Sequence, residues 1–584
     1  MLFSVLFILI TITNAQQQCG DSIEWNYDSS TKTLILTGNG EMYDYELLQT
    51  PWENYRTQMT KITISEGITT IGNNAFTSST SLTTVSFPST LMYIKNNTFA
   101  YCIKLSSFTL KNELKEIGHS AFFACYALRS ITIPSSVKII RESAFSCCST
   151  LSTVTLSEGL EIIENEVFET SPMIRSITIP STVKSIGFMA FAYNTEMTTV
   201  SIGKNVKEIG EMAFYGVTGL ISIVVSEENE MYSSQDGVLF NKNKTILMVY
   251  PSAKSSSSYT IPESVTTLKY ASFLSLSKLT TITIPDTVTR MEPETFKVSN
   301  SLVTVTIGKG IKEIPVAAFR GCESLKNINF SNSVITIGNS AFMQCLKLES
   351  ITFPENLKQI NSSAFQDCPK LTTISFNSQL ETIGSNAFSD CTSLKTIKLP
   401  QSLKTIGSYA FAYCTSLQTI YFEGNKQPTQ CASNAFDSSN NQPIEVTSHY
   451  EDSIFCGQEI HKQPLPVESS SHSSQITQSS SSTHATQSEQ SQQQSEYQSQ
   501  SVTSDIPVES TQNNDHSSNN QNNESKNDYP ENNNKEENSL LFIFIIILLV
   551  ICCLICVFVG IAIFINIKKR KKEIEVKEVL LELM

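Results

Sequence analysis

Cysteine offers the widest chemistry of any residue type in this chain, because its thiolate is a nucleophile and a metal ligand and two thiols can join as a disulfide. Eight of the fifteen cysteines lie three residues after a phenylalanine: Cys102, Cys125, Cys148, Cys322, Cys345, Cys368, Cys391 and Cys414. Zinc sites use close pairs such as C-x-x-C instead of one cysteine in each long repeat. The spacing therefore predicts a column of buried structural thiols, with disulfides between neighbouring members left open as an alternative.

Four cysteines lie outside both this column and the apolar segment near the C-terminus: Cys19, Cys147, Cys431 and Cys456. Cys431 and Cys456 flank the end of the repeats described below. A bridge between them would close a C-terminal cap and contribute roughly 3 kcal/mol. We treat this pair as a candidate disulfide on position alone.

Histidine, the commonest general base, is scarce. Of six histidines only His119 lies within the repeats, while the others follow them, at His449, His461, His472, His484 and His516. A Ser/His/Asp or Cys/His site would have to rest on His119, and the chain contains no P-loop and no clustered HxxxH motif. We therefore expect neither an enzyme nor a cofactor or metal site.

The phenylalanines that precede the cysteines mark a repeat, and we call them marker phenylalanines. One run comprises Phe76, Phe99, Phe122, Phe145, Phe168, Phe191 and Phe214, and a second comprises Phe273, Phe296, Phe319, Phe342, Phe365, Phe388 and Phe411; every step within each run is 23 residues. Phe436 follows 25 residues later. A fixed period of this length predicts a solenoid whose units stack only on their neighbours.

One unit, "ITFPENLKQINSSAF" from Ile351 to Phe365, indicates how each repeat folds. Ile351 and Phe353 alternate with polar residues, as in a short strand with one buried face. Pro354 then ends the strand, because proline lacks the N–H that the ladder needs. The spacing from Leu357 to Phe365 suits a return path of turns or a short helical piece.

The motif L-x-x-I-x-F/I-P-x-x-L-x-x-I-x-x-x-A-F-x-x-C resembles the leucine-rich repeats of the BspA-like family of surface proteins, known from bacteria and mucosal parasitic protists. The resemblance covers about residues 19–440. It implies a leucine-rich-repeat solenoid of the α/β horseshoe type, with a parallel β-sheet on one face and turns and short helical pieces on the other. It also implies a role in adhesion.

The step from Phe214 to Phe273 is 59 residues, longer than two periods. The Asp236-Gly237 turn signal and the apolar runs on either side of "NKNK" predict a β-hairpin that protrudes from the solenoid. Its aromatic residues Tyr232, Phe240 and Tyr250 are candidate ligand contacts.

The outward strand positions form a nearly uncharged column: Thr63, Ser86, Thr109, Thr132, Thr155, Thr178, Ser201, Thr260, Thr283, Thr306, Asn329, Thr352, Ser375, Lys398 and Tyr421. Thr simply suits a solvent-facing strand position, or else the column meets a repetitive ligand such as a glycan, a matrix protein or another copy of the chain. Binding hot spots favour aromatic residues and Arg, so Lys398 and Tyr421 are the second candidate contact region.

The two ends of the chain predict its placement at a membrane. "MLFSVLFILITITNA" is typical of a secretory signal peptide. Leu540 to Ile565 is an uncharged run of 26 residues, enough for a transmembrane helix, and "KKRKK" directly after it predicts a cytoplasmic C-terminus. We expect a single-pass type I plasma-membrane protein whose ectodomain is extracellular.

The expected order of segments is a signal peptide (1–15), an N-terminal cap (16–57), a first repeat block (58–225), the inserted hairpin (226–257), a second repeat block (258–438), a C-terminal cap (439–462), a disordered Ser/Gln/Asn-rich stalk (463–538), the transmembrane helix (539–566) and a tail (567–584). Sequons at Asn96, Asn243, Asn361 and Asn523 are candidate glycosylation sites. Leu580 and Leu581 resemble a dileucine sorting signal, although the spacing to Glu575 is one residue too long.

These features favour a cell-surface adhesin or recognition protein that binds host cells, extracellular matrix or other microbes. An endocytic receptor that captures a soluble ligand and a self-associating coat protein are the alternatives. The net charge of −14, with no basic stripe interleaved with aromatic residues, argues against nucleic acid as a partner.

Overall fold

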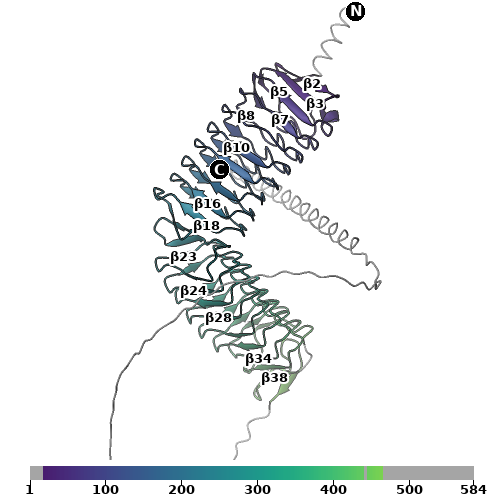
Figure 1. Cartoon of the computed structure of the whole chain (residues 1–584). Coiled ribbons are helices and arrows are strands. Elements are labelled where there is room, and N and C mark those ends of the chain that lie inside the picture. The colour runs from purple at the N-terminus through teal and green to yellow at the C-terminus, as the bar shows by residue number, and fades with distance from the viewer. Residues whose placement is uncertain (1–16, 440–442, 464–584) are drawn as a thin grey trace, which may run out of the picture. The chain divides into compact units, whose positions relative to one another are not determined.

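The computed structural model describes residues 17–439 and 443–463, in which short strands stack into an elongated, curved solenoid (Figure 1). The predicted signal peptide, stalk, transmembrane helix and tail lie outside these residues. Within the described residues, no helix is long and apolar enough to cross a membrane.

Each repeat contributes a first strand to a parallel ladder, except the repeat that follows β7 (Thr84–Ser86), where Ser107 makes an isolated bridge to Thr84. In the first block these strands are β5 (Lys61–Ile64), β7 (Thr84–Ser86), β10 (Ser130–Ile133), β12 (Thr153–Leu156), β14 (Ser176–Thr178), β16 (Thr199–Ile202) and β18 (Ser222–Val225). In the second block they are β22 (Ser258–Thr260), β24 (Thr281–Ile284), β26 (Thr304–Ile307), β28 (Asn327–Asn329), β30 (Ser350–Thr352), β32 (Thr373–Ser375), β34 (Thr396–Leu399) and β36 (Thr419–Phe422). The register advances by one repeat, so that Ile131 pairs with Val154.

The return path corrects the expectation of short helical pieces, because it contains a second, shorter strand in place of a helix. These strands are β6 (Ile68–Ile71), β8 (Tyr93–Ile94), β9 (Glu116–Ile117), β11 (Ile139–Ile140), β13 (Ile162–Ile163), β15 (Ser185–Ile186) and β17 (Glu208–Ile209), then β23 (Thr267–Leu268), β25 (Arg290–Met291), β27 (Glu313–Ile314), β29 (Thr336–Ile337), β31 (Gln359–Ile360), β33 (Thr382–Ile383), β35 (Thr405–Ile406) and β37 (Gln430–Cys431). The one helical element of the described residues is the 3-10 turn η1 (Glu53–Tyr55) in the N-terminal cap. The solenoid is therefore built almost entirely of strands and turns.

A turn around the marker phenylalanine completes each repeat; we call the five residues centred on it the arm. In the arm 340–344 the N–H groups of Ser340, Phe342 and Gln344 donate to carbonyls of the next repeat, at or directly before its arm, over 2.9, 2.7 and 2.9 Å. Ser340 and Gln344 have positive φ values of 53° and 63°. A left-handed residue other than glycine costs of order 1 kcal/mol, and the bonds between arms offset that cost.

The marker phenylalanines stack inside the solenoid. The rings of Phe319 and Phe342 are 5.1 Å apart and inclined by 3°. The first stack begins on Trp52 of the N-terminal cap, whose ring lies 5.3 Å from that of Phe76, and the second begins on Tyr250, 5.1 Å from Phe273. Each stack runs through its own hydrophobic core.

The hairpin region corrects a second expectation, because it does not protrude. Its strands β19 (Tyr232–Gln235), β20 (Val238–Asn241) and β21 (Ile246–Val249) continue the stack, and β21 pairs with β23 in parallel. Leu239 is buried in the first core, whereas its neighbours Val238 and Phe240 are buried in the second. The strand β20 therefore joins the two repeat blocks.

Short strands close both ends. The N-terminal cap contains β1 (Gln18–Gly20), β2 (Ile23–Asp28), β3 (Thr33–Gly38) and β4 (Gly40–Glu41). β3 pairs with β5 in parallel and so presents a template for the first repeat. At the other end β38 (Ile444–Val446) and β39 (Ile460–Lys462) extend the first ladder.

Candidate functional site

The cysteine column is buried and hydrogen bonded. All eight side chains are 0 % exposed and unpaired as disulfides. Each thiol donates to the carbonyl oxygen of the marker phenylalanine in the preceding repeat, over Sγ to O distances of 3.1 to 3.5 Å. Ser171, Asn194 and Ser299 occupy the same place in repeats without cysteine and donate to the same carbonyl. In each of these repeats the cysteine therefore provides a small hydrogen-bond donor for the buried carbonyl of the preceding marker phenylalanine.

Burial also makes these thiols poor nucleophiles. It raises the pKa of Cys102 to about 12 and that of Cys345 well above its usual value. The thiolate is the reactive form, so at neutral pH the column stays protonated. Among the described residues no group of three or more His, Cys, Asp or Glu side chains is placed to hold a metal ion.

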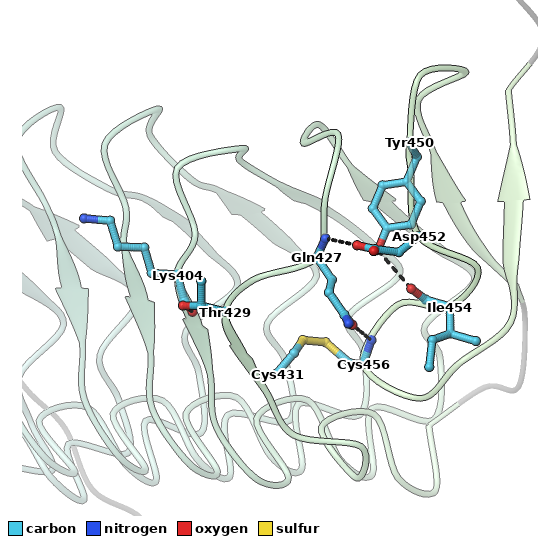
Figure 2. Close-up of a disulfide and its surroundings, with 8 residues drawn as sticks. All are labelled: Lys404, Gln427, Thr429, Cys431, Tyr450, Asp452, Ile454 and Cys456. Carbon is cyan, nitrogen blue, oxygen red and sulfur yellow. Dashed lines mark hydrogen bonds between the residues drawn. A yellow bond between two sulfur atoms is a disulfide. The ribbon is translucent and has the colours of Figure 1, made fainter.

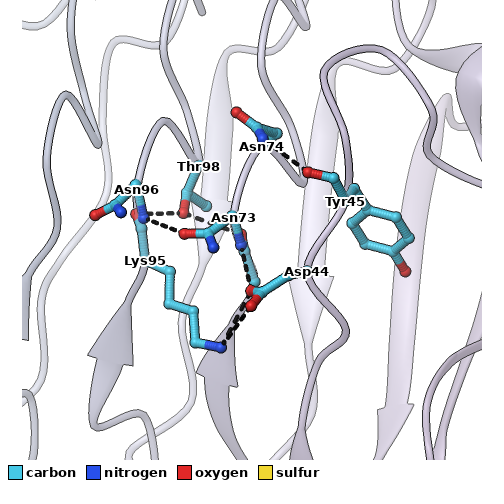
Figure 3. Close-up of polar contacts among 8 residues, drawn as sticks. Asp44, Tyr45, Asn73, Asn74, Lys95, Asn96 and Thr98 are labelled. Carbon is cyan, nitrogen blue, oxygen red and sulfur yellow. Dashed lines mark hydrogen bonds and ion pairs between the residues drawn. The ribbon is translucent and has the colours of Figure 1, made fainter. Parts of the chain in front are cut away.

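His119 lies beside a ladder of asparagines on the second-strand side of the N-terminal repeats. Its backbone N–H donates to Asn96 Oδ1 at 2.9 Å, and the N–H of Asn96 donates to Asn73 Oδ1 at the same distance. Figure 3 shows this ladder continuing to Asp44, which accepts from the N–H of Asn73 at 2.8 Å and from Lys95 Nζ at 3.1 Å. The ladder provides hydrogen-bond acceptors for the backbone N–H groups of successive turns.

Three of the four sequons lie on described residues. Asn96 and Asn243 are exposed and Asn361 is half-buried, while Asn523 lies outside the described residues. Glycosylation at these positions stays a prediction.

The outward strand column lies on the open face of the first ladder. In β10 and β12 the outward residues are exposed, and Ser130 pairs with Thr153 as Thr132 does with Thr155. At the C-terminal end Lys398 Nζ lies 2.5 Å from Glu423 Oε1 and 6.0 Å from the centre of the Tyr421 ring. Glu423 raises the pKa of Lys398, so the cation is retained at this end of the face.

Two of the three hairpin aromatics lie in the core. Phe240 is 0 % exposed and Tyr250 is 2 % exposed, so both belong to the core. Tyr232 is half-buried, and its hydroxyl accepts from the N–H of Ile209 at 3.0 Å and donates to Lys207 O at 3.4 Å. These residues hold the hairpin in the stack, and the expectation that Phe240 and Tyr250 touch a ligand is corrected by their burial.

The repeat geometry agrees with a sequence comparison. The family model for the BspA type leucine rich repeat region matches residues 53–173, 115–246, 249–371 and 335–462, which together exceed half of the chain. The chain belongs to the BspA-type leucine-rich repeat family. No match was found among curated proteins.

Solved structures from several bacteria are similar to this chain. A leucine-rich repeat protein from Eubacterium ventriosum is 24 % identical over 69 % of this chain and 95 % of its own, with a TM-score of 0.46. A leucine rich cell surface protein from Faecalibacterium prausnitzii is 24 % identical over 73 % and 98 %, with a TM-score of 0.43. The pneumococcal vaccine antigen PcpA is 21 % identical over 74 % and 94 %, with a TM-score of 0.40.

In this BspA-type solenoid four of the eight exposed tyrosines among the described residues lie on the arms, a position that the sequence reasoning missed. Tyr101, Tyr193 and Tyr413 each lie two residues after a marker phenylalanine and are 44 %, 41 % and 48 % exposed. Tyr409 lies two residues before Phe411 and is 39 % exposed. Their distance of two residues from a marker, on one side or the other, is the sequence signal that could have found them. We call this set the arm tyrosines.

The BspA-type repeats end in a disulfide between Cys431 and Cys456, whose Cα atoms are 5.0 Å apart (Figure 2). Gln427 fixes the same loop, because its N–H donates to Asp452 Oδ2 at 2.8 Å and its Oε1 accepts from the N–H of Cys456 at 3.4 Å. Tyr450 is buried and donates its hydroxyl to Ile454 O at 3.0 Å. These contacts close the end of the second core.

Proposed function

We propose that this chain is a cell-surface adhesin or recognition protein, which binds protein or glycan ligands of host cells, extracellular matrix or other microbes through its leucine-rich repeats. The observation that carries the proposal is the set of arm tyrosines. Tyrosine is enriched at binding hot spots because it buries a large rigid area and keeps one polar atom for a hydrogen bond. Membership of a repeat family whose proteins serve as binding scaffolds supports it further.

The backbone of the arms suits this role. Tyr413 donates its N–H to Asp437 O at 3.0 Å, and the neighbouring Phe411 donates to Ala435 O at 2.8 Å. The tyrosine side chains therefore project from a backbone that is fixed before binding, which lowers the entropy lost on association. The predicted stalk and transmembrane helix would present many copies on one membrane, so that weak contacts add up.

The test uses the full chain displayed on cells and a panel of matrix glycoproteins, mucins and epithelial surfaces. The double variant Tyr409→Ala with Tyr413→Ala should weaken saturable binding at least 10-fold, since a hot-spot tyrosine contributes roughly 1–2 kcal/mol or more. Tyr93→Ala is the matched control, because Tyr93 is 37 % exposed but lies on β8 and not on an arm. Absence of binding to every surface by the unaltered chain would refute the proposal.

A further inference from the structure

A cavity of about 260 Å³ lies where the first repeat block meets the hairpin strands. One wall is the arm 212–216, and the facing wall includes Lys269, Tyr270 and Ala271. Leu239, Met248 and Val249 also line the cavity. We call this cavity the notch.

The notch exists because one arm is missing. Tyr250 takes the place of a marker phenylalanine, since it stacks on Phe273 and donates its N–H to Ser272 O at 2.7 Å. The residues just before it belong to the strand β21, so no five-residue turn surrounds Tyr250. The arm 212–216 consequently has no successor, although its left-handed residues Met212 and Gly216 give it the same backbone as the other arms.

The missing arm leaves three backbone donors unused. In the preceding repeat the N–H groups of Met189, Phe191 and Tyr193 donate to the carbonyls of Glu211, Ala213 and Tyr215 at 3.3, 2.9 and 2.7 Å. Ala213 and Tyr215 lie on the arm 212–216, and Glu211 directly precedes it. The corresponding N–H groups of Met212, Phe214 and Gly216 have no acceptor within the part of the chain that the structure describes. They lie on alternate residues of a wall that lines the notch.

The width of the notch is fixed by a contact across its rim. The hydroxyl of Tyr215 donates to Glu294 Oε2 at 3.1 Å, and its ring lies 6.4 Å from that of Tyr270. Glu294 is also paired with Lys297 at 3.0 Å. The two walls are therefore held apart before any ligand enters.

The notch is otherwise apolar and nearly balanced in charge. Phe214 is 6 % exposed, and Met212 and Met248 are half-buried beside it. The charged lining residues are Glu211, which is exposed, and Lys269, which pairs with Glu292 at 3.0 Å. A ligand here must supply acceptors to alternate N–H groups and apolar atoms to the side chains between them.

We propose that the notch binds an extended, uncharged and apolar peptide segment of a partner protein, which takes the place of the missing arm. Its backbone carbonyls accept hydrogen bonds from the N–H groups of Met212, Phe214 and Gly216, as the carbonyls of a following arm do elsewhere. Backbone bonds of this kind supply affinity, and the side-chain contacts supply selectivity. The proposal deepens the proposed function by naming a site and a class of partner, and it rests on that function.

The test selects random linear 12-residue peptides on the full chain and measures the affinity of the best synthetic peptide. Met212→Trp should weaken peptide binding at least 10-fold, because the indole fills the notch; Tyr409 shows that a large aromatic side chain fits this arm position at a φ of 57°. Met189→Trp changes the same arm position one repeat earlier and should leave binding unchanged. Met248→Glu, which places a charge in the notch, should weaken binding to a similar degree.

Hydrogen exchange gives a second measurement that does not depend on the affinity. The amides of Met212, Phe214 and Gly216 should exchange at least 10-fold faster than those of Met189, Phe191 and Tyr193 in the free chain, and peptide should slow them. Selection of no peptide, equal binding by Met212→Trp and Met189→Trp, or an oligosaccharide that binds in the notch instead would each overturn the proposal. Binding of the unaltered chain to the surface panel, measured in parallel, separates the two proposals. If the chain binds the peptide but none of the surfaces, the adhesin role alone is refuted.

Discussion

Replacing Phe342 with alanine should open the middle of the second stack. Phe342 is 0 % exposed, and its ring stacks on Phe319 and Phe365 at 5.1 Å on both sides and meets the edge of Phe330 at 5.9 Å. A buried Phe to Ala change costs about 3–5 kcal/mol, and each lost aromatic pair adds about 0.5–1.5 kcal/mol beyond area. We therefore expect a loss near the top of that range, about 5 kcal/mol.

Two other phenylalanines calibrate this value. Phe214 is also buried but has a single stacking partner among the markers, Phe191 at 5.8 Å, so Phe214→Ala should cost about 3 kcal/mol. Phe188 is 39 % exposed, and Phe188→Ala should change stability by about 0.5 kcal/mol or less.

The assay is hydrogen exchange of the full chain, because units of a solenoid contact only their neighbours and lose stability locally. The opening free energies of arms 317–321 and 363–367 should fall in Phe342→Ala while those of 97–101 stay unchanged. Equal effects of Phe342→Ala on the arms 317–321 and 363–367 and of Phe188→Ala on the neighbouring arm 189–193 would refute the view that the stacked rings hold the arms together.

Three further predictions concern single features. Cys345→Ser should change the free energy of unfolding by about 1 kcal/mol or less, because Ser171 makes the same bond to a marker carbonyl at 3.1 Å. In the unaltered chain the cysteine column should resist iodoacetamide at pH 8 until the chain is unfolded. Burial and the nearby Glu166 raise the pKa of Glu169 from 4.5 to about 7. Between these pH values the folded state binds more protons than the unfolded state, so the protein loses stability as pH rises through them. Glu169→Gln should therefore flatten the dependence of Tm on pH and raise the free energy of unfolding at pH 8 by about 1 kcal/mol, a value discounted because the carboxyl is partly exposed. Cys456→Ser opens a loop of 25 residues and should cost about 3 kcal/mol in the C-terminal cap, seen as proteolysis there while arms 317–321 stay protected.

The period of the repeat predicted most of the fold. The marker phenylalanines recur at steps of 23 residues, and a solenoid buries every one of them. The return path was harder to predict. In the pair Gln359–Ile360 a strand has only one inward residue, so no alternation distinguishes it from a turn or a short helix. The strand identity comes from pairing with neighbouring repeats, which a single unit does not encode.

The sequence of the hairpin contains a sign of burial that contradicts the expectation of a protruding hairpin. Val238, Leu239 and Phe240 are apolar in succession, as in a strand covered on both faces, whereas a protruding hairpin would have one polar face. Phe240 and Tyr250 are therefore core residues. The notch could not be foreseen, since it depends on which N–H groups lack a following arm.

The left-handed residues of the arms have a consequence for how this surface changes over time. At the position two residues before the markers from Phe76 to Phe411, φ stays between 50° and 59°, while the residue is Asn in three repeats and Ser, Glu, Met, Ala or Tyr in the others. The conformation is imposed by bonds from arm to arm, so the side chain there has little part in holding the fold. Point mutations along this edge can alter what the solenoid displays without altering the solenoid, and duplicated repeats can diverge independently from one another. The arms thus behave as a row of interchangeable display positions on which new specificities can arise by single substitutions.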